Sequence, residues 1–131
     1  MRRTFAACVI IAALAFIAAA QDWYHDREER FRAEGWRPHL FVYVRTDLER
    51  IWSAVQASDK ERARLDKTKQ ELTKMQADLD HNQWDNGILN DVIDSIRKSS
   101  NDDRLAQRDR GVLADDLVRL KEFQDQHNRP H

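Results

Sequence analysis

The stretch between Pro38 and Gly87 contains neither glycine nor proline. These two residues most often end a helix, so a stretch without them leaves room for one extended helix. Within it, apolar residues recur at spacings of three, four or seven positions, with one gap of ten between Val55 and Leu65. They are Val44, Leu48, Ile51, Val55, Leu65, Leu72 and Leu79. A single apolar stripe on a helix explains this recurrence, and a strand does not.

Capping residues and charge pairs set the limits of the expected helix. Thr46 and Glu49 have the spacing of a capping box, so we expect the helix to span residues 46–81, with a start near Pro38 as the alternative. The stripe is weakest near Ser58 and Arg62, which disfavours a long coiled coil and favours packing against the rest of the chain. Acidic residues precede basic ones by three positions, which stabilises an exposed helix face. The pairs are Asp47/Arg50, Asp59/Arg62, Glu61/Arg64, Asp66/Lys69 and Glu71/Lys74.

The C-terminal third contains two similar segments, residues 85–97 and 109–121. Both match D-x-G-[IV]-L-x-D-x-[IL]-x-x-[IL]-[RK]. Each begins with an aspartate suited to capping a helix N-terminus, Asp85 or Asp109. We expect helices over 86–98 and 110–126, joined by a polar loop at 99–103. Duplication of a helical unit and convergence on the same capping pattern both explain the similarity.

The helix lengths predict how these segments pack. A helix over 46–81 is about 54 Å long, and the two C-terminal helices together are about 45 Å long. Two short helices lying in sequence would therefore cover the stripe of the long one. The expected fold is all-α: a long central helix packed against two shorter C-terminal helices, preceded by a short N-terminal helix. A compact bundle in which the long helix breaks is the alternative.

Residues 21–37 combine aromatic side chains with many charges, which suits a short amphipathic helix ended by Gly35 and Pro38. Aromatic residues often anchor protein interfaces, and they also fill the cores of small helical proteins. The aromatic residues of this segment are therefore candidates for partner binding, with a core role as the alternative. They are Trp23, Tyr24, Phe31 and Trp36. We expect residues 39–44 to lead into the long helix, and Trp84 to pack at the turn after it.

The first 20 residues have the anatomy of a secretory signal peptide. Arg2 and Arg3 precede an apolar run, and Ala18, Ala19 and Ala20 supply small residues for cleavage. A membrane-spanning helix needs about 20 apolar residues, which is more than this run offers. We expect cleavage after Ala20, a periplasmic or secreted location, a single helical domain over 21–131 and no stable membrane insertion after cleavage.

The composition of residues 21–131 narrows the classes of function. This part has no cysteine, so it contains no disulfide, and it carries 20 basic residues against 23 acidic ones. Such a balance disfavours nucleic acid and anionic membranes as partners. A protein partner or a second copy of the chain fits better.

Motifs that carry chemistry are missing from the sequence. The five histidines, at positions 25, 39, 81, 127 and 131, lack ligand spacing and are expected to be solvated. Asn101-Asp102-Asp103 does not continue into a calcium loop. There is also no nucleophile motif or phosphate-binding glycine loop. The sequence therefore predicts no enzyme, no metal and no cofactor.

Two segments of the chain resemble known groups of proteins. Leu72-Thr73-Lys74-Met75-Gln76 resembles the LTxxQ signature of periplasmic stress chaperones, which are small, helical and poor in cysteine. In that family the motif opens a helix and recurs, whereas here a single copy falls inside the expected helix. The block YHDREERF at residues 24–31 is similar to small exported bacterial proteins of unassigned function. That similarity extends through Trp36-Arg37, Leu40-Phe41, Val44-Arg45, Asp47-Leu48, 64–69, 108–110 and 115–117.

Together these observations predict an exported helical protein with a non-catalytic role in binding or envelope structure. A chaperone-like holder of unfolded clients is the alternative within binding proteins. An unrecognised enzyme or a metal-responsive protein is the alternative from another class.

Overall fold

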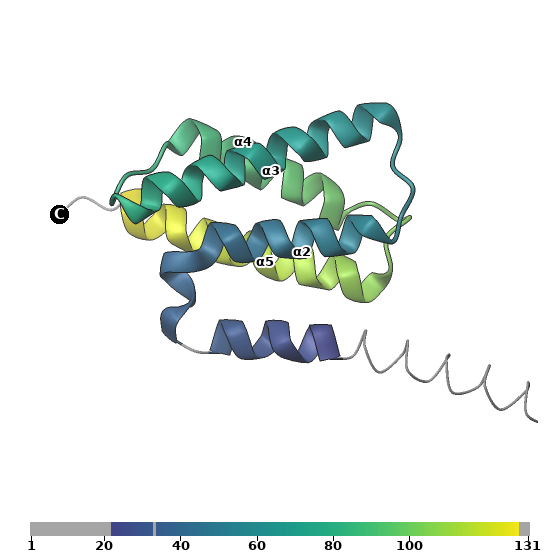
Figure 1. The fold of residues 1–131 in the computed structure, drawn as a ribbon, viewed down its shortest axis with the longest axis horizontal. Coiled ribbons are helices and arrows are strands. Elements are labelled where there is room, and N and C mark those ends of the chain that lie inside the picture. Colours follow the sequence, from purple (N-terminus) through teal and green to yellow (C-terminus); the bar gives the residue numbers. More distant parts are fainter. Residues whose placement is uncertain (1–21, 33, 129–131) are drawn as a thin grey trace, which may run out of the picture. The chain divides into compact units, whose positions relative to one another are not determined.

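The computed structural model describes residues 22–32 and 34–128 (Figure 1). Residues 22–32 are helical, and a 3₁₀ helix, η1, follows over Glu34–His39. Four α-helices come next, and no strand occurs in the described ranges. They are α2 (Leu40–Ser53), α3 (Asp59–Asp80), α4 (Asn86–Ser100) and α5 (Gln107–Asn128). The all-α class is confirmed. The expected signal peptide and its cleavage site lie outside the described residues.

The chain forms two compact units, and the division between them along the sequence falls between Trp36 and Arg37. In the N-terminal unit, the rings of Trp23 and Tyr24 contact edge to face with their centroids 4.8 Å apart. The rings of Phe31 and Trp36 lie 6.1 Å apart. Of residues 39–44, expected to be a helical lead-in, His39 ends η1 and residues 40–44 form the start of α2.

Helices α2–α5 form a closed bundle in the C-terminal unit. Helix α2 packs on α3 and α5, and α4 packs on the same two helices (Figure 1). Each helix presents an apolar face to the centre, as the periodicity predicts. Large side chains from all four helices are fully buried there, including Phe41, Leu48, Leu72, Met75, Leu89, Ile96, Leu113 and Leu120.

The expected long helix over 46–81 is interrupted, so its continuity was predicted wrongly. Helix α2 ends at Ser53 and α3 begins at Asp59. The second helix has its own start signal: Ser58 Oγ accepts a hydrogen bond from the Glu61 backbone N–H, and Glu61 accepts one from the Ser58 N–H. The break lets the two halves fold back on each other and bury both apolar faces. This is the compact bundle that the sequence left as the alternative.

Thr46 does not cap a helix, contrary to the sequence prediction. It lies within α2, and its hydroxyl donates to the Val42 carbonyl at 2.9 Å. The residue at the α2 N-cap, His39, makes no capping hydrogen bond with its side chain. Gln76 of α3 takes this role from across the bundle. Its amide donates to the Pro38 carbonyl at 2.7 Å and accepts from the Val42 N–H at 3.2 Å.

The two C-terminal helices lie close to their predicted limits. The Asp85 side chain caps α4 by accepting from the Ile88 N–H at 3.0 Å, as expected. Helix α5 starts at Gln107, so Asp109 lies in its first turn and is not the N-cap residue. The loop between the helices is also shifted, because α4 continues to Ser100 and the Ser99 side chain is buried.

Candidate functional site

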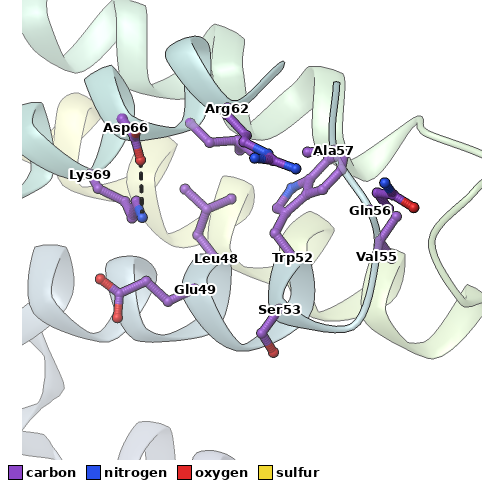
Figure 2. A pocket seen from close by; sticks show the side chains of 11 residues that line it. Leu48, Glu49, Trp52, Ser53, Val55, Gln56, Ala57, Arg62, Asp66 and Lys69 are labelled. Atoms are coloured by element: carbon purple, nitrogen blue, oxygen red, sulfur yellow. Dashed lines mark ion pairs between the residues drawn. The ribbon is translucent and has the colours of Figure 1, made fainter. Parts of the chain in front are cut away.

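A hollow of about 390 Å³ opens where α2 ends and α3 begins (Figure 2). We call it the apolar hollow, because the side chains of Leu48, Trp52 and Leu65 form its buried floor. Residues of the connection between the helices, Val55 and Ala57, close one end. The break in the expected long helix therefore creates this site: the floor residues of α2 and α3 come together only because the chain turns back on itself.

Trp52 lies in the floor of the apolar hollow, and its contacts fix the orientation of its ring. Its indole N–H donates to the Ser99 hydroxyl of α4 at 3.1 Å, which satisfies the buried polar atom. The Arg104 guanidinium lies 5.6 Å from the centroid of its ring, within the range of a cation–π interaction. Only 8% of the residue remains exposed. The small part of this rigid ring that is exposed contributes to the apolar lining of the hollow, where it can contact an apolar ligand.

Arg104 connects the floor to the start of α3. Its guanidinium donates to both carboxylate oxygens of Glu61, with Nη1 2.9 Å from Oε1. It also donates to Asp102, with Nη2 2.7 Å from Oδ2. These hydrogen bonds favour the charged carboxylates. The hydrogen bond from Arg104 therefore lowers the pKa of Glu61 to about 2 and also lowers the pKa of Asp102.

Charged side chains form the rim of the apolar hollow. Lys69 and Asp66 form an ion pair at 3.3 Å on α3, drawn as the dashed line in Figure 2. Glu49 of α2 pairs with Arg45 at 3.3 Å, and Arg62 completes the rim. The paired side chains are between 36% and 65% exposed, so the rim is polar while the floor is apolar. Protein interfaces commonly have this arrangement.

A second hollow of about 600 Å³ continues from the first along α2 and α3. It shares Glu49, Asp66 and Lys69 with the apolar hollow. Arg45, Thr73 and Lys74 line its further part. We call the two hollows together the α2–α3 groove.

The aromatic residues proposed from the sequence are not among the residues that line the groove. Trp23, Tyr24, Phe31 and Trp36 belong to the N-terminal unit, where they form two pairs of neighbouring rings. None of them lines the α2–α3 groove. Their role in partner binding stays a prediction.

The sequence contains only a faint signal for the groove. The apolar stripe weakens near residues 58–64, beside Trp52 in the chain. That weakness indicated looser packing, but it did not indicate that Trp52 and Leu65 would share one surface.

Several of the aspartate and histidine residues that the sequence raised as possible metal ligands contact other side chains in the bundle. Asp102 binds Arg104, and Asp103 pairs with Arg110 at 3.4 Å. Within the described ranges, no three His, Cys, Asp or Glu side chains are grouped so that they could hold a metal ion. His127 is less solvated than expected, because its ring stacks on Phe123 with centroids 3.9 Å apart. Trp84, expected at the preceding turn, contacts His127 edge to face at 4.5 Å.

The residues of the LTxxQ segment stabilise the helical bundle through burial and hydrogen bonds. Leu72 is fully buried, and the Gln76 amide caps α2. Thr73 accepts a hydrogen bond from Arg45 at 2.7 Å, which joins the same two helices. The segment lies inside α3, as the sequence predicted.

Comparisons with models of protein families, with curated proteins and with solved structures find no match for this chain. No helix in the described part of the chain is long and apolar enough to cross a membrane.

Proposed function

We propose that this chain is an exported, non-catalytic binding protein that holds an apolar segment of a polypeptide in the α2–α3 groove. The observation that carries the proposal is the apolar hollow, with Trp52 fixed at its centre and charged side chains at its edge. Ligand sites in proteins are typically concave and mainly apolar, with a few polar groups that orient the ligand. A polypeptide suits this open site because its side chains fill the hollow while its backbone stays accessible to the polar rim.

The paired charges of the rim favour binding over catalysis. Asp66 forms an exposed ion pair with Lys69, and Glu49 forms one with Arg45. Such pairs orient a ligand and exclude poor partners without taking part in bond making.

The exported location is supported by the composition of residues 1–20. It is tested by intact-mass measurement of the protein purified from cells that express the full chain. The proposal predicts a new N-terminus at Gln21 and recovery outside the cytoplasm. A product that retains Met1 and remains in the cytoplasm would contradict it.

The binding role is tested with a fluorescein-labelled peptide that contains Phe-Leu followed by Asn, Gln and Ser, the neutral peptide. Val55→Glu places a charge at the apolar end of the groove and should weaken binding at least about tenfold, or about 1.4 kcal/mol. Val118→Glu is the matched control, because Val118 is 54% exposed on α5 and outside the groove. Fluorescence anisotropy measures both. No binding to the unsubstituted protein, or equal loss in both variants, would refute the proposal.

A further inference from the structure

The α2–α3 groove is long enough for several residues of a bound chain. Its lining on α3 extends from Arg62 to Ala77. At 1.5 Å per residue this is about 22 Å along the helix axis. An extended peptide covers that distance with about six or seven residues, since it rises about 3.3 Å per residue.

The charge of the groove differs in sign from that of the whole chain. The chain has 22 basic and 23 acidic residues, with a net charge of −1 at pH 7. Four basic side chains line the groove against two acidic ones, and Asp78, which pairs with Lys74 at 3.4 Å, places a third acid beside it. The basic residues are Arg45, Arg62, Lys69 and Lys74, and the acidic ones are Glu49 and Asp66. A local excess of positive charge on a slightly acidic protein attracts negatively charged ligands to that surface.

The two ends of the groove have different chemistry. The Trp52 end is apolar, and its floor is buried. The other end combines Arg45 and Lys74 with the hydroxyl of Thr73. Lys69 lies between the ends, because it lines both hollows. A ligand that matches the whole groove therefore has an apolar group at one end and anionic groups toward the other.

The existing ion pairs leave the basic side chains accessible to such a ligand. Lys74 contacts Asp78 at 3.4 Å with more than half of its side chain exposed, while the side chains of Arg45 and Lys69 are 40% and 36% exposed. Exposed pairs of this kind contribute little to stability, so their lysine or arginine can accept a new carboxylate at small cost.

We propose that the occupant of the groove is an extended segment of a partner polypeptide that carries a large apolar residue followed by two or three carboxylates. The apolar side chain lies on Trp52, and the carboxylates pair with Lys69, Lys74 and Arg45. This inference rests on the proposed binding function and adds the class of ligand to it. The charge match supplies selectivity, and burial of the apolar residue supplies affinity.

The test compares three labelled peptides that share Phe-Leu and differ in the residues after it: the neutral peptide, one with Asp and Glu, and one with Lys and Arg. At low salt the acidic peptide should bind about tenfold more tightly than the neutral one, and the basic peptide should bind most weakly. The preference should shrink as salt increases, because exposed charges are screened.

A double variant, Lys69→Gln with Lys74→Gln, isolates the charge contribution. It should remove the preference for the acidic peptide and leave the affinity for the neutral peptide within about twofold, since the apolar floor is untouched. Lys121→Gln on the exposed side of α5 is the control and should keep the preference.

The outcomes separate this inference from the proposed function. Equal binding of the neutral and acidic peptides, or tighter binding of the basic one, overturns the charge inference and leaves apolar binding intact. No binding of any peptide overturns both. Self-association in sedimentation that Val55→Glu abolishes and the acidic peptide does not displace would show that a second copy occupies the groove, and this also overturns the inference.

Discussion

At the scale of single residues, Gln76 shows how a polar side chain can stabilise a helix to which it does not belong. The first N–H groups of a helix lack partners within that helix. Helix α2 has no capping side chain of its own, and Gln76 provides the acceptor for Val42 and a donor for Pro38. Gln76 is only 8% exposed, so water is a poor substitute for it.

Replacing Gln76 by alanine should therefore lower the free energy of unfolding by about 1–3 kcal/mol, because buried polar groups lose their partners. Urea denaturation followed by circular dichroism measures the change. Gln70→Ala, an exposed substitution on the same helix, should stay within about 0.5 kcal/mol of the unsubstituted protein. Equal effects of the two substitutions would show that the cap does not matter.

The Glu61–Arg104 interaction predicts a dependence of stability on pH. The Arg104 guanidinium lowers the pKa of Glu61 from 4.5 to about 2 in the folded chain. A carboxyl group whose pKa falls on folding stabilises the fold fully above its unfolded pKa and loses this contribution as pH falls through its folded pKa. The stabilisation from Glu61 is thus complete above about pH 4.5 and disappears toward pH 2.

Arg104→Gln should lower the melting temperature at pH 7, and the difference from the unsubstituted protein should shrink between pH 4.5 and pH 2. Calorimetry at a series of pH values measures this trend. Arg97→Gln, which removes an exposed ion pair with Asp94 at 3.0 Å, is the control for loss of a surface arginine. A difference that stays constant down to pH 2 would contradict the assignment.

At the scale of elements, the break between α2 and α3 shows where prediction from local sequence fails. Thr46-x-x-Glu49 and Ser58-x-x-Glu61 have the same capping pattern, and only the second forms a capping box. Local preferences do not choose between them. Tertiary packing decides which of the two patterns starts a helix. A turn near Ser58 buries the apolar faces of both helices, whereas one long helix would expose much of its stripe. The limits of α4 were easier to predict, since its cap and its apolar face agree.

The capping residues can be tested as a matched pair. Ser58→Ala should destabilise the protein by about 1 kcal/mol, because it removes the acceptor for the Glu61 N–H. Thr46→Ala should change stability by less than about 0.5 kcal/mol, since Thr46 lies inside α2 and bonds only to its own helix. Denaturation curves of the two variants decide the question. A larger loss of stability for Thr46→Ala than for Ser58→Ala would support the single long helix that begins at Thr46.

At the scale of the whole molecule, the all-α class was predictable from apolar periodicity, but the candidate site was not. Leu48 and Leu65 belong to the same apolar stripe in the sequence, and the periodicity predicts a packed position for both. In the bundle they are buried, yet they also form the floor of an open hollow, because the chain turns back between them. A surface made by a tertiary turn leaves little trace in local sequence.

The proposal that the α2–α3 groove is the binding site has a direct test in the indole N–H signals of the four tryptophans. The protein, as produced from the full chain, is labelled with ¹⁵N and titrated with the acidic peptide, and Trp52→Phe identifies the signal of Trp52. We predict that this signal shifts saturably, because Trp52 forms the floor of the groove, while those of Trp23, Trp36 and Trp84 change little. Shifts confined to Trp23 and Trp36 would instead place binding on the N-terminal aromatic residues and contradict the account.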